Sequence, residues 1–277
     1  MTLTANITDV VTGCEAGIRF LRRPGTEHGK AIVLLHGIGS NAGSFEPLFG
    51  ALPEAFDAIA WHGPGYGGSR SLVISSPRPD DYAEALLSFI DALNLECITL
   101  VGHSLGCLFA GSFAARNPER VGALALLSPA LGYGVKAGEA MPETVQGRID
   151  ELRALGPRDF AAKRAARLVY QPEIKPAVLH AVREAMAAID PVGYMQAARA
   201  LGAGDLMADA HNLSMKTLVA VGAQDVITPP TNARKLYDAL PRPAGFHEIP
   251  GAGHALPQEN PAAIARLLVN LIEACDA

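Results

Sequence analysis

The chain has 277 residues, which is long for one hydrophobic core and short for two, so its length favours a single α/β domain with an insertion. Apolar residues make up 49% of the sequence and charged residues 18%, and this composition excludes a disordered or polyelectrolyte chain. The formal charge of −5 comes without a dense basic cluster, which argues against a nucleic-acid partner.

The amino-terminal residues 1–11 contain neither the cationic segment nor the continuous apolar segment of a secretion signal. Elsewhere, no apolar run approaches the ~20 residues that would span a bilayer. We therefore expect a cytoplasmic protein that has no membrane partner.

The cysteines form neither a Cys-x-x-Cys pair nor a ligand-like group with histidines, which argues against a zinc site and against a disulfide framework. We expect all four to be small buried apolar residues: Cys14, Cys97, Cys107 and Cys275. The sequence therefore predicts neither a bound metal nor a cofactor.

Short apolar segments bounded by glycines predict the strands of a sheet. Residues 7–11 and 18–22, separated by Gly13 and Gly17, predict an antiparallel hairpin at the start of the chain. Continuous apolar runs are typical of strands buried on both faces of a parallel sheet, and they occur at residues 31–35, 97–101, 121–127 and 217–221. Residues 80–93 have apolar positions at helical spacing. This alternation predicts an α/β fold with a doubly wound, mostly parallel sheet.

Residues 131–212 lack strand signals and contain helical segments rich in Ala, Arg and Leu, separated by prolines. Because this region lies between two strands of one sheet, it predicts a helical cap and not an independent domain. The strand and helix pattern resumes at Lys216, and a final amphipathic helix is predicted after Pro261. We therefore expect an α/β core of residues 1–130 and 213–277.

The sequence Gly-His-Ser-Leu-Gly at residues 102–106 follows an apolar run and precedes a helical one. A Gly-x-Ser-x-Gly sequence in this context can hold a serine oxygen at a sharp turn, because glycines on both sides have no side chain that would clash. We expect Ser104 to be a nucleophile.

A serine hydroxyl is a weak nucleophile until a base takes its proton, and that base needs an acid that fixes its tautomer. Asp225 and His254 each follow a strand-like segment, which places them at the edge where open α/β sheets bind ligands. Taken singly, such residues are often a helix cap or a solvated histidine. Together with Ser104 they predict a catalytic triad. Asp205 and Asp209 are the alternative acids, although no clear apolar strand precedes either one.

An acyl-transfer reaction also needs backbone N–H groups that stabilise the oxyanion. Leu105 directly follows the expected nucleophile, and Ile38 lies in a glycine-containing loop after the first parallel strand, so we expect these two residues to form the oxyanion hole. His36 is expected to orient that loop, and His103 to be a packed or hydrogen-bonded side chain.

Five segments together make the chain resemble the α/β-hydrolase superfamily: LLHGIGSNAGSF, GPGYGGS, LVGHSLG, LVAVGAQDVITPP and PGAGHALPQENP. The resemblance implies an α/β-hydrolase fold with a serine nucleophile. Residues 189–194 and the helical cap are similar to the branch that holds 3-oxoadipate enol-lactonases and meta-cleavage-product hydrolases. The superfamily includes many chemistries, so the resemblance is specific for fold and triad and weak for substrate.

Two positions qualify this resemblance. Many members carry an aspartate where this chain has His62, before a Gly-Pro-Gly sequence. We expect His62 to be part of the loop structure because the glycine and proline framework is intact, and a side chain facing the substrate is the alternative. Ser104 stands where the resembling dehalogenases and epoxide hydrolases use an aspartate, which argues against those activities.

The sequence therefore predicts a cofactor-independent serine hydrolase that cleaves a small carboxylic ester or enol-lactone through an acyl-enzyme. One alternative is carbon–carbon bond hydrolysis of a meta-cleavage-type dienoate, and another is a receptor that kept the fold without turnover. Cap arginines could clamp a substrate carboxylate, although an arginine on a helix is more often solvated. The candidates are Arg148, Arg153, Arg164 and Arg167. The expected partner is a small carbonyl compound, and the oligomeric state is not predicted.

Overall fold

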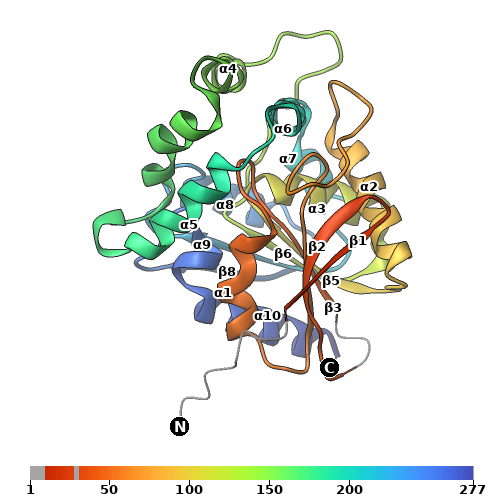
Figure 1. Ribbon diagram of the computed structural model, residues 1–277. Coiled ribbons are helices and arrows are strands. Elements are labelled where there is room, and N and C mark those ends of the chain that lie inside the picture. Colours follow the sequence, from red (N-terminus) through yellow and green to blue (C-terminus); the bar gives the residue numbers. More distant parts are fainter. Residues whose placement is uncertain (1–9, 28–30, 277) are drawn as a thin grey trace.

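The computed structural model describes residues 10–27 and 31–276 of the chain (Figure 1). One eight-stranded sheet forms its centre, in the order β1-β2-β4-β3-β5-β6-β7-β8. β1 and β2 run antiparallel to their neighbours, and the other strands are parallel to one another. The strands are β1 (Val11–Glu15), β2 (Ile18–Arg23), β3 (Ala31–Leu35), β4 (Asp57–Trp61), β5 (Ile98–His103), β6 (Val121–Leu127), β7 (Lys216–Gly222) and β8 (Pro243–Ile249).

The side chains of the central strands alternate between two hydrophobic cores. On β3, Val33 and Leu35 belong to the core on one face of the sheet, whereas Ile32 and Leu34 belong to the core on the other face. Successive side chains of a strand point to opposite faces, so a strand that is covered on both faces has to be apolar throughout. This is the physical origin of the continuous apolar runs in the sequence.

Helices cover both faces of the sheet. α2, α3 and α8 contribute to the first core, and α1 and α10 contribute to the second. The helices are α1 (Glu46–Ala51), α2 (Pro79–Ala92), α3 (Leu105–Arg116), α4 (Glu143–Arg164), α5 (Pro176–Ala187), α6 (Pro191–Ala203), α7 (Leu206–Ala210), α8 (Pro230–Asp238), α9 (Leu256–Glu259) and α10 (Pro261–Asp276), with the short 3-10 helices η2 (Ala42–Phe45), η3 (Pro118–Arg120), η4 (Ala165–Leu168) and η5 (Pro172–Ile174). The predicted fold class, a doubly wound and mostly parallel sheet, is confirmed.

The strand order indicates where a protein with this sheet would bind a ligand. From β3 the chain continues to β4 on one side, and later to β5 on the other side of β3. In open α/β sheets, ligands bind beyond the carboxyl ends of the strands at the point where the order reverses. Here that point lies between β3 and β5, which are followed by Ile38 and Ser104 respectively.

Between β6 and β7 the chain forms the helices α4 to α7, which lie together at the upper end of the sheet in Figure 1. Within residues 131–212 the only strand-like pairing is an isolated bridge between Gly132 and Asp205. α4 is interrupted at Gly156, whose φ of 72° is not helical, directly before Pro157. In the described part of the chain, no helix has both the length and the apolarity to cross a bilayer.

Two expectations differ from the structure. The first strand of the hairpin is β1, which begins at Val11 and contains Gly13, whereas residues 7–11 were expected to form it. Residues 7–9 of that predicted segment lie outside the described residues. The expectation of buried cysteines is wrong for three of the four, because Cys14, Cys97 and Cys275 are exposed and only Cys107 is buried. Cys14 lies on the edge strand β1, Cys97 directly precedes β5, and Cys275 is next to the last residue of α10, so none of the three lies in a part of an element that is covered on all sides.

Candidate active site

Ser104 lies on the sharp turn between β5 and α3. Its φ of 54° and ψ of −114° are rare for a residue with a side chain, and its N–H donates a hydrogen bond of 2.9 Å to Leu127 O, which helps to hold the turn. Both flanking glycines are required by close backbone contacts. A Cβ atom at Gly102 would lie 2.6 Å from Gly106 O, and one at Gly106 would lie 2.2 Å from Leu35 O. The turn therefore presents the serine only with glycine on either side.

We expect Gly106→Ala to destabilise the protein by at least about 3 kcal/mol, because the new methyl group would meet main chain on β3 that cannot move aside. Gly147→Ala is the matched control, since Gly147 lies in α4 and a Cβ atom there would meet no neighbour within 4 Å, so alanine is expected to add about 0.5–1 kcal/mol. Urea unfolding of both variants measures the difference. Equal stability of the two would contradict the tight turn.

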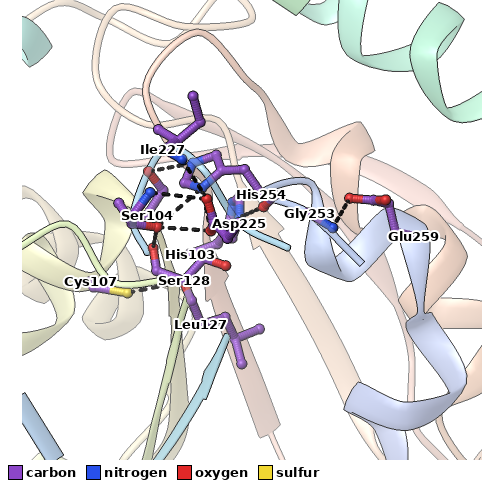
Figure 2. Close-up of polar contacts among 11 residues, drawn as sticks. His103, Ser104, Cys107, Leu127, Ser128, Asp225, Ile227, Gly253, His254 and Glu259 are labelled. Atoms are coloured by element: carbon purple, nitrogen blue, oxygen red, sulfur yellow. Dashed lines mark hydrogen bonds and ion pairs between the residues drawn. The ribbon is translucent and has the colours of Figure 1, made fainter. Parts of the chain in front are cut away.

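Ser104, Asp225 and His254 come together at the carboxyl ends of β5, β7 and β8 (Figure 2). His254 Nε2 lies 3.0 Å from Ser104 Oγ, and His254 Nδ1 lies 2.9 Å from Asp225 Oδ2. All three side chains are buried. Because a carboxylate only accepts, the Nδ1 atom carries the proton, and the neutral ring turns the lone pair of Nε2 toward the serine hydroxyl. The predicted nucleophile, base and acid thus lie in one hydrogen-bonded chain.

Asp225 is held as an anion by its neighbours. Its Oδ1 atom accepts hydrogen bonds from Ile227 N at 2.8 Å and Thr228 N at 3.0 Å. The Thr228 hydroxyl lies 2.9 Å from Asp225 Oδ2 and 3.0 Å from Ser128 O, and its single proton can serve one of these acceptors at a time. Burial by itself raises the pKa of Asp225, but the electrostatic interaction with His254 and these hydrogen bonds outweigh burial and lower the pKa to about 2.

The alternative acids lie elsewhere. Asp205 accepts a hydrogen bond of 3.1 Å from Ala208 N at the start of α7. Asp209 lies 3.7 Å from Arg116. Neither forms a hydrogen bond or ion pair with His254 among the described residues, so the acid that contacts the histidine is Asp225.

Two backbone N–H groups adjoin the serine. Leu105 is the first residue of α3, and an N–H group in the first turn of a helix has no acceptor within that helix. Ile38 lies in the loop after β3, and both residues line the same cavity as Ser104 and His254. This placement is compatible with the expected oxyanion hole.

The other histidines near the site support its loops. His36 Nδ1 lies 2.8 Å from Gly37 O, and its Nε2 accepts a hydrogen bond of 3.0 Å from Gly63 N, so the ring connects the loops after β3 and β4. His103 Nε2 donates to His254 O at 2.8 Å and thereby holds the backbone of the histidine loop. These contacts confirm the expected structural roles of His36 and His103. His62 is half-buried and does not line the cavity beside Ser104, which agrees with its expected loop role.

Burial of His36 leads to a testable pH dependence. Burial lowers its pKa to about 4, against about 6.5 in an unfolded chain. The unfolded state therefore binds a proton between pH 6.5 and 4 that the folded state does not, so the stability contributed by His36 is present above pH 6.5 and is lost as the pH falls. Between pH 7 and pH 5 we expect the wild type to lose about 2 kcal/mol more stability than His36→Gln, measured by urea unfolding. Parallel stability curves would show that His36 does not titrate in this way.

A cavity of about 270 Å³ lies beside Ser104 and His254. This volume is near the lower end for ligand pockets in proteins, which indicates a small ligand. Three of the four candidate arginines line it, namely Arg148, Arg164 and Arg167. Arg153 does not line it, and lies 3.6 Å from Asp150 on the exposed surface of α4. Among the described residues, no group of three or more His, Cys, Asp or Glu side chains could hold a metal ion.

Glu259 is not among the residues predicted from the sequence, and its side chain is fully buried behind the loop that carries His254 (Figure 2). Its Oε1 atom accepts a hydrogen bond of 2.8 Å from Gly253 N, next to His254. Its Oε2 atom accepts from Tyr170 N at 3.0 Å and from Lys175 Nζ at 2.7 Å. Nothing in the apolar pattern distinguishes this carboxylate, although its place shortly after the predicted base could have drawn attention to it.

A mostly parallel sheet with a serine on a sharp turn between a strand and a helix is the architecture of the α/β hydrolases. The model of the alpha/beta hydrolase family matches residues 32–267, and the chain belongs to this family. The expected class of enzyme, an α/β-fold hydrolase, is confirmed.

Relatives with known names cover almost the whole chain. The protein named "Putative carbamate hydrolase RutD" from Variovorax paradoxus is 29% identical over 253 residues, which are 90% of this chain and 93% of that protein. The 2-hydroxy-6-oxo-6-phenylhexa-2,4-dienoate hydrolase of Burkholderia cepacia is 26% identical over 268 residues, 88% of each chain. The crystal structure of the enol-lactonase from Burkholderia xenovorans LB400 has the same fold, with a TM-score of 0.82 and 24% identity over 95% of this chain and 100% of that chain.

Proposed function

We propose that the protein is a cofactor-independent serine hydrolase that cleaves a small carboxylic ester or lactone through an acyl-enzyme. The observation that carries this proposal is the hydrogen-bonded chain from Asp225 through His254 to Ser104, with the serine and the histidine lining one cavity. These groups are what acyl transfer requires, namely a nucleophile, a base and an orienting acid.

In the first half of the proposed reaction, His254 Nε2 takes the proton of Ser104 Oγ while the oxygen attacks the carbonyl carbon. The N–H groups of Ile38 and Leu105 donate to the oxyanion, and each such donor is typically worth about 10²–10³ in rate. His254 then returns the proton to the leaving oxygen as the carbon–oxygen bond breaks. The result is an ester of Ser104 and a free hydroxyl group, which in a lactone stays on the same molecule.

In the second half, a water molecule gives one proton to His254 and adds its oxygen to the acyl carbon. The bond to Ser104 Oγ breaks, the serine recovers its proton from His254, and a carboxylic acid leaves. Throughout, Asp225 keeps the proton of the neutral ring on Nδ1 and stabilises the charged ring.

We also propose that residues 131–212 act as a cap that selects the substrate. α4 and η4 contribute the arginines of the cavity, and α5 and α6 contribute Met186 and Tyr194, while the core contributes Ser104. A cap in this place would bring binding groups to a triad whose own residues are common to many reactions.

Hydrolysis of a carbon–carbon bond is the second candidate, because the Burkholderia cepacia relative is named a dienoate hydrolase. A panel of enol-lactones, aryl esters of graded acyl length and ring-fission dienoates separates the two candidates by kcat/KM. Preference for a dienoate would overturn ester or lactone hydrolysis as the main activity.

The reactive serine is tested with a fluorophosphonate probe, which modifies activated serines. We expect the native protein to be labelled on Ser104 and the Ser104→Ala variant to remain unlabelled, with peptide mass analysis to locate the label. Heat-denatured protein is the control for unspecific reaction. Absence of labelling in the native protein would favour the third candidate, a receptor that binds a ligand without turning it over.

A further inference from the structure

Thr228 contacts both the acid and the base of the proposed triad. It is nearly buried, with 8% of its surface exposed, and it lines the same cavity as Ser104. Its hydroxyl oxygen lies 2.9 Å from Asp225 Oδ2 and 3.2 Å from His254 Nδ1. In the proposed reaction this hydroxyl neither gives nor takes a proton, so its place beside the acid and the base requires another explanation.

The carboxylate of Asp225 has a donor at each of its acceptor positions. A carboxylate has about four lone-pair sites on its two oxygens. Oδ1 accepts from Ile227 N at 2.8 Å and from Thr228 N at 3.0 Å. Oδ2 lies 2.9 Å from His254 Nδ1 and 2.9 Å from the Thr228 hydroxyl. Thr228 thus supplies a donor to each oxygen, and the carboxylate cannot turn without breaking one of these bonds.

The proton of the Thr228 hydroxyl has two acceptors within reach, Asp225 Oδ2 at 2.9 Å and Ser128 O at 3.0 Å. His254 Nδ1 is not a third, because it carries a proton itself. A hydrogen bond to a charged acceptor is roughly twice as strong as one between neutral groups, so the proton goes to the carboxylate. Ser128 O becomes the acceptor only where residue 225 carries no charge.

Ser128 follows β6 and lies next to the proposed triad (Figure 2). Its φ of 46° is rare for a residue with a side chain, and its N–H donates a hydrogen bond of 2.7 Å to Ala220 O. Backbone conformations of this kind persist where the surrounding structure holds them, and they are frequent at functional sites. Here the strained backbone places the carbonyl of Ser128 against the Thr228 hydroxyl, which keeps the hydroxyl beside the acid.

We infer that Thr228 is a positioning residue, whose hydroxyl and N–H hold the Asp225 carboxylate so that Oδ2 faces His254 Nδ1. The histidine then keeps the tautomer that can take the proton of Ser104. The inference rests on the proposed function, because it needs His254 to act as the base. Since Thr228 acts through Asp225, loss of its hydroxyl should lower kcat and leave KM nearly unchanged.

Thr228→Val removes the hydroxyl and keeps the shape of the side chain. We expect kcat for 4-nitrophenyl acetate to fall by about 10- to 100-fold, because a hydrogen bond to a charged group is lost, and KM to stay within about twofold. Thr228→Ser retains the hydroxyl and should keep kcat within about threefold of the wild type. Thr228→Ala, which lacks the hydroxyl and adds no bulk, replaces Thr228→Val where that variant does not fold.

Thr217→Val is the matched control. Thr217 is a fully buried threonine of β7, and its hydroxyl donates to Met215 O at 3.2 Å. This contact does not involve the acid or the base, so the variant should keep the kcat of the wild type.

A double variant distinguishes an effect through the acid from a general disturbance of the site. In Asp225→Asn the uncharged side chain no longer attracts the Thr228 proton, which turns to Ser128 O. Adding Thr228→Val to Asp225→Asn should therefore lower kcat by less than about twofold further. A further loss of about 10-fold or more would overturn the inference, because Thr228 would then act independently of Asp225.

Proton NMR gives a measurement that does not depend on turnover. A ring proton on Nδ1 that is bonded to a carboxylate gives a signal downfield of the backbone amide protons, because the bond is charge-assisted. We expect this signal in the wild type and in Thr228→Ser, its absence in Asp225→Asn, and a displaced signal in Thr228→Val. An unmoved signal in Thr228→Val together with the kcat of the wild type would overturn the inference and leave the proposed function intact. A displaced signal in a protein that hydrolyses no ester or lactone would contradict the proposed function and support the contact of Thr228 with the acid.

Discussion

Ser104→Ala is expected to lower kcat by about 10⁶, and His254→Ala by a similar factor. The 3.0 Å contact between Ser104 Oγ and His254 Nε2 means that each residue depends on the other, since the serine without a base is a weak nucleophile and the base without the serine has no proton to take. The double variant should therefore be no slower than either single variant. The activity that remains would come from the oxyanion donors and from substrate binding.

The measurement is kcat for 4-nitrophenyl acetate with each purified variant, together with its unfolding temperature. Ser88→Ala serves as the control, because Ser88 is on α2 and donates its hydroxyl to Glu84 O away from the cavity. A Ser104→Ala enzyme that keeps a tenth of the activity would exclude this serine as the nucleophile. Additive losses in the double variant would mean that the two residues act separately.

Asp225→Asn is expected to lower kcat by about 10⁴ while KM changes little. The amide of asparagine can donate to His254 Nδ1, which moves the ring proton to Nε2 and removes the lone pair that faces Ser104. The hydrogen bonds from Ile227 N and Thr228 N would still hold the side chain in place, so the fold should tolerate the change.

Steady-state kinetics with the same ester measure this effect, and Asp209→Asn is the control for an acid that does not contact the histidine. Activity within tenfold of the wild type would mean that Asp225 does not fix the tautomer. Although burial raises the pKa of Asp225, the electrostatic interaction with His254 and the hydrogen bonds lower it to about 2, so the carboxylate is ionised at every pH above about 4. A fall in activity in weak acid is therefore not expected to come from protonation of Asp225.

Much of the fold could be predicted because its strands are buried on both faces. The runs at 31–35 and 121–127 match β3 and β6 residue for residue, and the predicted helix at 80–93 differs from α2 by one residue at each end. β8 was less apparent, since all of its residues except the last are exposed or only partly buried at the edge of the sheet, and its sequence is mixed. The pattern of apolar residues in a sequence reflects burial, so the pattern is weak in a strand that is only partly buried.

The predicted site residues Ser104, Asp225 and His254 lie together because each one follows a parallel strand, and such strands end at the same edge. The sequence could not show which arginines of residues 131–212 line the cavity, since Arg148 and Arg153 both lie on α4 and only the packing of this helix distinguishes them. Contacts between distant segments, such as Thr228 with Ser128, have no local pattern that could reveal them.

The buried carboxylate of Glu259 has a consequence for how a substrate reaches the cavity. It joins the loop of His254 to residues 170–175, and Ala255 N donates a further hydrogen bond of 2.8 Å to Leu168 O between the same two segments. Separating these two segments would leave the buried carboxylate of Glu259 without its partners, which typically costs about 3–5 kcal/mol. The segment from η4 to η5 is thus a fixed wall, and we expect the entrance to the cavity to open at another border of residues 131–212, so that His254 keeps its contact with Ser104 while molecules enter and leave.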